Sequence, residues 1–200
     1  MYNFLIIIVL AIPIYFITIF IFDLLLRGFA PFIPSRPWVI DEIMNELDLG
    51  NRNKKFIAFS TGRSGFMHAL EKKYPEAEFI AIEPSFFPFI VSRLQILLRK
   101  TKIKVYFKKI HHVDVSDADF IYSHLYPDRM EGLGPKLKFE CKSGAKVVST
   151  GFNIVHLKPY KIVELPDRKG KLDFLSKNQN LFQKRSKKYK KEKKAFFYEI

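Results

Sequence analysis

From residue 39 to residue 152 the sequence alternates segments of helical periodicity with short apolar runs, and this alternation limits the possible folds more than any other feature. Apolar residues three and four positions apart are typical of a helix with one buried face, whereas short apolar runs that end at turn residues are typical of buried strands. Strands that alternate with helices predict a parallel sheet with helices on both faces. We therefore expect an α/β fold.

The expected elements follow one another along the chain. An amphipathic helix is expected over residues 39–49. Strands are expected at 55–59, 78–83, 104–110, 118–126 and 145–152, and helices at 65–74, 88–100 and 128–141, the last one broken by Gly132, Gly134 and Pro135. Residues 159–166 and 194–200 are expected to form a terminal antiparallel pair.

The N-terminal segment is apolar over a length that suits a membrane. Residues 4–22 contain no charged residue, and residues 24–26 extend the apolar run beyond Asp23. About 20 apolar residues are enough for a helix to cross the ~30 Å hydrocarbon core of a bilayer, and Pro13 is tolerated in such a helix. The alternative is a cleaved signal peptide, which needs a basic start and a small-residue cleavage site that this segment lacks. We expect one transmembrane helix over residues 4–26.

The flanks of this segment predict its orientation. Arg27 and Arg36 follow it and no basic residue precedes it, so the positive-inside rule places the remaining chain on the cytoplasmic side. Three prolines within residues 27–38 predict an extended connector, and one folded domain is expected over residues 39–200. The single cysteine, Cys141, cannot form an internal disulfide, which fits a reducing compartment.

The chain is strongly basic, with 34 Lys and Arg against 20 Asp and Glu and a net charge of +14. Residues 184–194 hold eight basic residues and one acid. Such a segment is a solvated loop, a contact with anionic lipid beside the expected membrane helix, or a nucleic-acid contact. The nucleic-acid reading has the least support, because Tyr189 is the only aromatic residue placed for base stacking.

The stretch KFIAFSTGRSGF, residues 55–66, joins an expected strand to an expected helix through a turn that contains glycine. Glu83 ends the next expected strand about 20 residues later, which is the spacing at which nucleotide-binding α/β folds place an acid on the ribose hydroxyls. The alternative for Glu83 is a solvent-exposed carboxylate at a strand end.

Four passages resemble class I S-adenosylmethionine-dependent methyltransferases, and in particular the small membrane-anchored lysine methyltransferases of the FAM173 type and their prokaryotic relatives. They are GFAPFIPSRP, KKYPEAEFIAIEPS, SDADFIYSHLYP and the terminal FFYEI, at residues 28–37, 72–85, 116–127 and 196–200. The resemblance implies a Rossmann-like methyltransferase sheet, mostly parallel with an antiparallel terminal hairpin. It also implies S-adenosylmethionine as the cofactor and a protein lysine side chain as the acceptor.

The resemblance implies that Ser60, Gly62 and Ser64 occupy the three glycine positions of the cofactor turn, and that Glu83 is the ribose acid. The sequence departs from the family at other cofactor positions. Ala58 and Arg63 stand where the family has acids, and Lys109 stands close to the acceptor for the adenine. Asp114 is a substitute for that acceptor only if the loop bends.

The segment 123–128 follows the expected fourth strand, where methyltransferases place substrate and catalytic groups. Methyl transfer to an amine needs alignment of the nucleophile and removal of its proton. Tyr126 and His124 could position or deprotonate the amine, and the alternative is that both are partly buried strand-end residues.

Three functions therefore remain open on the sequence. The first is a membrane-anchored, S-adenosylmethionine-dependent methyltransferase that acts on protein lysine. The second is a catalytically inactive descendant of the same fold that serves as a membrane-tethered interaction module. The third is an adaptor that binds anionic lipid or nucleic acid through residues 184–194.

Overall fold

The computed structural model describes residues 9–15, 17, 37–47, 49–50, 54–60, 65–125, 127–165 and 194–200. The chain divides into two units, Met1–Pro34 and Ser35–Ile200. In the first unit, residues 9–15 and 17 are helical and exposed. Among the described residues, no helix has both the length and the apolar character needed to cross a bilayer. Most of the transmembrane helix expected at 4–26, and residues 27–36 of the expected connector, lie outside the described residues.

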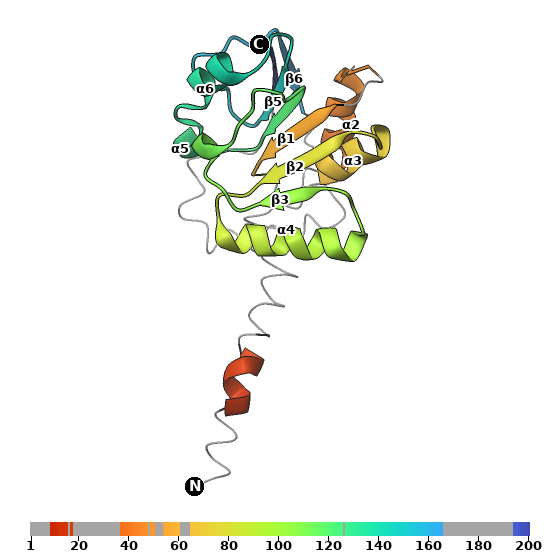
Figure 1. The fold of residues 1–200 in the computed structure, drawn as a ribbon, viewed down its shortest axis with the longest axis vertical. Coiled ribbons are helices and arrows are strands. Elements are labelled where there is room, and N and C mark those ends of the chain that lie inside the picture. The colour runs from red at the N-terminus through yellow and green to blue at the C-terminus, as the bar shows by residue number, and fades with distance from the viewer. Residues whose placement is uncertain are drawn as a thin grey trace. The chain divides into compact units, whose positions relative to one another are not determined.

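The second unit is built on a seven-stranded sheet in the order β3-β2-β1-β4-β5-β7-β6 (Figure 1). Five strands run parallel to one another: β1 (Lys55–Phe59), β2 (Glu78–Ile82), β3 (Lys104–Tyr106), β4 (Phe120–Ser123) and β5 (Lys146–Thr150). β7 (Lys194–Glu199) lies antiparallel between β5 and β6 (Lys161–Glu164). The α/β fold and the terminal antiparallel pair are therefore confirmed.

Helices cover both faces of this sheet, as the alternation of elements predicts. The helices are α2 (Pro37–Glu46), α3 (Gly65–Lys73), α4 (Phe86–Arg99), α5 (Pro127–Met130) and α6 (Leu133–Glu140). Successive strand residues point to opposite faces, so Phe56 and Ala58 of β1 join the core under α2 and α3, whereas Ile57 and Phe59 join the core under α5 and α6.

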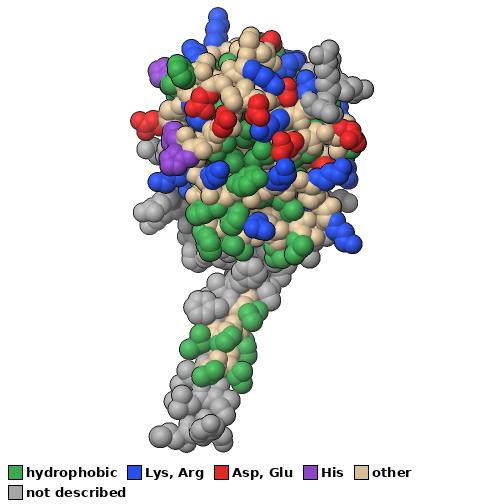
Figure 2. All heavy atoms as spheres, viewed as in Figure 1, with side chains coloured by type: hydrophobic (Ala, Val, Ile, Leu, Met, Phe, Trp, Pro, Cys, Tyr) green, Lys and Arg blue, Asp and Glu red, His purple; other side chains and the backbone are tan. Residues whose placement is uncertain are grey.

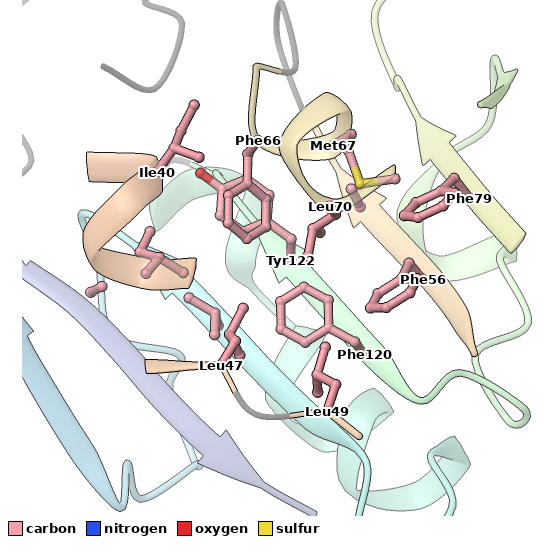
Figure 3. Close-up of a cluster of buried hydrophobic side chains, with 14 of the residues drawn as sticks. Ile40, Leu47, Leu49, Phe56, Phe66, Met67, Leu70, Phe79, Phe120 and Tyr122 are labelled. Atoms are coloured by element: carbon pink, nitrogen blue, oxygen red, sulfur yellow. The ribbon is translucent and has the colours of Figure 1, made fainter. Parts of the chain in front are cut away.

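Aromatic rings pack α3 against the sheet and pack neighbouring strands against one another (Figure 3). The Phe66 ring of α3 stacks on Tyr122 of β4 with 4.3 Å between centroids. Phe56 of β1 stacks on Phe79 of β2 at 5.0 Å and meets Phe120 of β4 edge-on at 5.7 Å. Each such pair adds about 0.5–1.5 kcal/mol beyond the area that it buries. The start of α3 is thus fixed directly over β4, close to the end of β1.

Most elements begin or end within a few residues of the expected positions, and β3 shows the largest change at a strand end. The strand expected at 104–110 ends at Tyr106. Its last paired residue lies opposite Ile82, where β2 also ends, and Glu83 N donates to Tyr106 O (3.0 Å) just beyond. Among the described residues, no strand lies beside residues 107–110. Residues 110–112 form a 3₁₀ turn instead.

The broken helix also differs in detail. The break falls at Gly132, whose φ of 74° caps α6, whereas Gly134 and Pro135 lie within the first turn of α6. Proline is tolerated there because its missing N–H would have no helical partner.

Candidate functional site

The order of the strands reverses at β1, which pairs with β2 on one side and β4 on the other. In open α/β sheets ligands bind at the carboxyl ends of the strands beside such a reversal. Phe59 of β1 is in register with both Ile82 and Ser123, so the residues that follow the three strands share one edge of the sheet. This edge is the candidate site.

The structure brings three of the predicted site residues together at this edge. Ser60 N donates to Ile82 O (2.9 Å), and His124 N donates to Phe59 O (3.2 Å). Ser60, Glu83 and His124 therefore follow neighbouring strands in direct succession. Gly62, Ser64 and Tyr126 lie outside the described residues.

Ser60 has a strained backbone and an unpartnered hydroxyl. Its φ is +50°, in the left-handed region, which costs an L-residue about 1–2 kcal/mol and costs glycine almost nothing. Its Oγ is buried and has no hydrogen-bond partner in the part of the chain that the structure describes. The backbone at this position thus keeps the shape of a glycine turn although the residue is serine.

Glu83 is buried, with 2% of its surface exposed. This contradicts the alternative of a solvent-exposed carboxylate at the strand end. Glutamate is almost never fully buried without polar partners, and a carboxylate at the end of β2 can accept hydrogen bonds from ligand hydroxyls.

Ser123 begins the segment 123–128 that the sequence singled out, although no role was predicted for this residue. It ends β4, is 0% exposed, and its Oγ has no hydrogen-bond partner among the described residues. A buried hydroxyl without a partner costs about 1–3 kcal/mol. The only signal in the sequence is a serine that closes the apolar run of β4.

His124 belongs to a polar network at the ends of β4 and β5. Its Nδ1 lies 2.7 Å from Thr150 Oγ1, and Thr150 Oγ1 lies 3.2 Å from the hydroxyl of Tyr122. Thr150 is 1% exposed whereas His124 is only partly buried. The threonine therefore holds the imidazole in one orientation.

The two residues considered for the adenine acceptor lie elsewhere. Lys109 is exposed at the start of the 3₁₀ turn Ile110–His112. Asp114 accepts a hydrogen bond from Ser116 N (2.9 Å). That hydrogen bond lowers the pKa of Asp114, and Lys55 at the opposite end of β1 contributes. The loop does not bend to bring Asp114 to the carboxyl edge.

An aromatic group occupies the end of β3 instead. Phe107 follows Tyr106, is 52% exposed, and lies 6.0 Å from the ring of Phe86 and 5.7 Å from that of Phe89. Because Glu83 N bonds to Tyr106 O, these rings lie beside the end of β2. Sequence reasoning missed them, since Phe107 was assigned to the interior of a longer strand.

Hydrogen bonds within the domain hold the segment that follows β5 in place. Ser149 Oγ donates to Phe152 O (2.7 Å), the Tyr198 hydroxyl donates to Asn153 Oδ1 (2.7 Å), and Ile154 N donates to the Tyr198 oxygen (2.8 Å). Burial raises the pKa of Tyr198 to about 12.

Within the described ranges, no three His, Cys, Asp or Glu side chains converge as a metal site would need.

Comparison with known proteins identifies the fold. No family model matches the sequence, and no curated protein matches it. An RNA methyltransferase from Salinibacter ruber, solved with S-adenosyl-L-homocysteine, superposes with a TM-score of 0.63 at 15% identity over 84% of this chain and 93% of that chain. A geranyl diphosphate C-methyltransferase from Streptomyces coelicolor A3(2) gives 0.61 at 11% identity over 80% and 77%. The StiE O-methyltransferase fragment gives 0.58 at 15% identity over 86% and 80%.

The second unit has the class I methyltransferase fold. The methyltransferase fold accounts for the insertion of β7 between β5 and β6 and for the reversal of strand order at β1. The three similar enzymes are named for different acceptors, and one fold commonly serves many substrates. The fold therefore indicates where a ligand would lie but not which acceptor is used.

Proposed function

We propose that the protein is an S-adenosylmethionine-dependent methyltransferase whose cofactor lies at the carboxyl edge of β1, β2 and β4. The observation that carries this proposal is the buried Glu83 beside the left-handed Ser60, at the reversal of strand order in a methyltransferase fold. The hydroxyls of Ser60 and Ser123, buried without partners among the described residues, fit a polar ligand at the same edge. The similar enzymes from Salinibacter and Streptomyces were both solved with S-adenosyl-L-homocysteine.

Each group at this edge has a role in the proposal. Ser60, Gly62 and Ser64 would be the residues that come close to the cofactor, and the Glu83 carboxylate would accept hydrogen bonds from the ribose hydroxyls. Phe107 offers an apolar face to the purine in place of the missing polar acceptor. When bound, the cofactor supplies a methyl group on a sulfonium, so the protein has to bind and orient the reactants.

His124 is the group in this proposal that handles a proton. Thr150 holds its imidazole in place, and the exposed part of the ring can take the proton from an incoming amine. Tyr126, two residues further on, would position the amine. A protein lysine side chain is the proposed acceptor, because it needs this deprotonation and because the resemblance in sequence favours it.

The proposal includes a membrane anchor. Residues 4–26 would span the bilayer once and leave the catalytic domain on the cytoplasmic side, on the strength of their apolar length and of the basic residues that follow. Residues 184–194 would contact anionic lipid headgroups. Because a spanning helix would itself hold the protein to vesicles, the loop is tested on residues 37–200 alone. Their co-sedimentation with anionic vesicles should fall when residues 184–193 are removed; unchanged sedimentation would show that this loop does not bind lipid.

Titration calorimetry of the full chain in detergent with S-adenosylmethionine tests the proposed site. We expect binding in the micromolar range, reduced at least tenfold in Glu83→Gln, because the neutral amide is a weaker acceptor for ribose hydroxyls than the carboxylate. Glu76→Gln is the matched control, since Glu76 is an exposed acid in the turn before β2.

A specific observation favours the second candidate, a catalytically inactive interaction module. Ala58, where the family has an acid, is fully buried in the core under α2 and α3, and Lys109 is exposed. An absence of heat with both S-adenosylmethionine and S-adenosylhomocysteine at millimolar concentration would leave this second candidate standing. Binding that does not change in Glu83→Gln would remove Glu83 from the site.

A further inference from the structure

One face of α4 is apolar and exposed. The opposite face is buried on the domain, with Val91 5% and Ser92 8% exposed. The exposed side chains, at 66%, 43%, 43% and 73% exposure, are Phe86, Ile90, Leu94 and Leu97. Residues three and four positions apart share one side of a helix, so these four form a continuous apolar stripe along α4. Contiguous exposed apolar patches mark interaction sites, whereas single exposed residues do not.

The stripe continues onto the edge of the sheet. Phe107, which follows β3, meets the Phe86 ring edge-on at 6.0 Å, and Tyr106 beside it is 41% exposed. Figure 2 shows hydrophobic side chains gathered over α4 and β3, with Lys and Arg side chains among them. The surface is thus wider than one helix, and it adjoins β3, which is an edge strand of the described sheet.

The charge around the stripe is mainly positive. Two acids from other elements face basic residues of this region: Glu78 pairs with Lys104 Nζ at 2.7 Å, and Glu71 accepts a hydrogen bond from Lys102 N at 2.6 Å. Residues 84–113 contain no Asp or Glu and seven basic residues, which are Arg93, Arg99, Lys100, Lys102, Lys104, Lys108 and Lys109. Two of these cations lie beside rings of the patch: the Arg93 guanidinium is 5.9 Å from the Phe89 ring and the Lys108 amine is 5.7 Å from the Tyr106 ring. Apolar groups flanked by cations complement an anionic lipid surface, where acyl chains lie just beneath phosphate groups.

We propose that the α4 stripe, made of Phe86, Ile90, Leu94 and Leu97, rests on an anionic bilayer surface. The apolar side chains enter the boundary between headgroups and acyl chains, while Arg93 and Lys100 contact lipid phosphates. A second copy of the chain fits less well, because pairing the two faces would bring like charges together. Phe107 borders the stripe but belongs to the proposed cofactor site, so it is not counted in this contact. The contact of the four stripe residues does not depend on residues 184–194 or on the span expected at 4–26.

A local fluorescent probe on the full chain tests this contact. The protein carries Cys141→Ser together with Ile90→Cys, is labelled with nitrobenzoxadiazole at residue 90, and is reconstituted into vesicles. We expect a blue shift and a roughly doubled emission in phosphatidylcholine vesicles that contain phosphatidylserine, compared with phosphatidylcholine alone. The label leaves water only when the basic residues around the stripe bind the anionic headgroups.

Phe139 provides the matched control. It is 93% exposed on α6, so Phe139→Cys labelled in the same way places the probe away from α4 and should show no difference between the two vesicles. Adding Leu94→Glu to the Ile90→Cys protein should abolish most of the response, because a carboxylate then stands in the stripe. Phe139→Glu in the same protein should leave the response intact.

Three results would overturn the proposal. The first is an unchanged spectrum at residue 90 in anionic vesicles. The second is an equal response in vesicles of phosphatidylcholine alone, which would mean that charge plays no part. The third is a blue shift in detergent that grows with protein concentration, which would assign the stripe to a second copy of the chain. None of these results affects the calorimetric test of cofactor binding, so the two proposals fail separately.

Discussion

The segment after β5 and the turn after β1 lie at the same edge of the sheet but are held in different ways. After β5, the Tyr198 hydroxyl binds both Asn153 and the backbone of Ile154. After β1, Ser60 has a left-handed backbone and a buried Oγ without a partner in the described part of the chain.

This difference separates polar groups that stabilise the fold from polar groups that remain available to bind a ligand. A buried polar group with an internal partner stabilises the native state, whereas one without a partner costs stability unless a ligand supplies the bond. Strained backbone is likewise retained where function requires it. We therefore expect substitutions in the first region to change stability alone, and substitutions in the second to change ligand binding as well.

Gly134→Ala should give the largest loss of stability. A Cβ at this position of α6 would lie 1.9 Å from the carbonyl oxygen of Val155, in the segment after β5. Neither the helix nor that backbone can move aside cheaply, so we expect the free energy of unfolding to fall by about 2–3 kcal/mol. Urea unfolding followed by circular dichroism measures the change.

Lys138→Ala is the control for this substitution, because Lys138 is exposed on the same helix. It should change the free energy of unfolding by less than about 0.5 kcal/mol. Equal stability of Gly134→Ala and Lys138→Ala would mean that α6 and the segment after β5 are not in close contact.

Tyr198→Phe should have the next largest effect. The phenyl ring keeps the packing but leaves Ile154 N and the Asn153 side chain without the tyrosine oxygen. We expect a loss of about 1–2 kcal/mol in urea unfolding, with S-adenosylmethionine affinity unchanged. In the control Tyr160→Phe, which alters a residue that is 55% exposed, stability should hardly change.

The same tyrosine predicts a pH dependence. Burial raises the pKa of Tyr198 from an ordinary value of 10.0 to about 12 in the folded state. The folded protein therefore keeps a proton that the unfolded chain releases, so this contribution is complete below pH 10 and is lost as the pH rises toward 12. The wild type should lose stability across that window more steeply than Tyr198→Phe; parallel curves would contradict the assignment.

Much of the fold could be predicted from local sequence. The apolar runs of β1 and β2 and the helical periodicity of α3 can each be recognised within a few neighbouring residues. This is possible because the spacing of apolar side chains determines which face of an element is buried. The position of Glu83 after β2 follows from the same local pattern. Its burial could not be predicted, since it depends on neighbours from other elements.

Other features depend on contacts between distant segments. β3 ends at Tyr106 because β2 ends beside it, and the sequence of β3 continues without a break. Ser123 lacks a partner only by virtue of what surrounds it in three dimensions. The spacing of residues in a single sequence does not predict such contacts between distant segments.

Ser60→Gly tests the second region, with the smallest expected change in stability and the clearest link to function. Glycine adopts the left-handed backbone without the 1–2 kcal/mol cost to serine, but loses more entropy on folding, so we expect a net gain of about 0.5–1 kcal/mol. Removal of the Cβ and the unpartnered hydroxyl should also bring the turn closer to S-adenosylmethionine and tighten its binding in calorimetry. A gain in both quantities would place strain and ligand at the same residue.

His156→Gly separates the two effects. His156 is also left-handed, with φ of +68°, but it lies in the segment after β5. It should therefore gain a similar amount of stability with no change in cofactor affinity. If both glycine variants stabilise the protein and neither alters binding, the strain at Ser60 is a feature of the fold alone, and the contrast between the two regions would no longer concern ligand binding. If only Ser60→Gly tightens binding, the left-handed turn is part of the cofactor site.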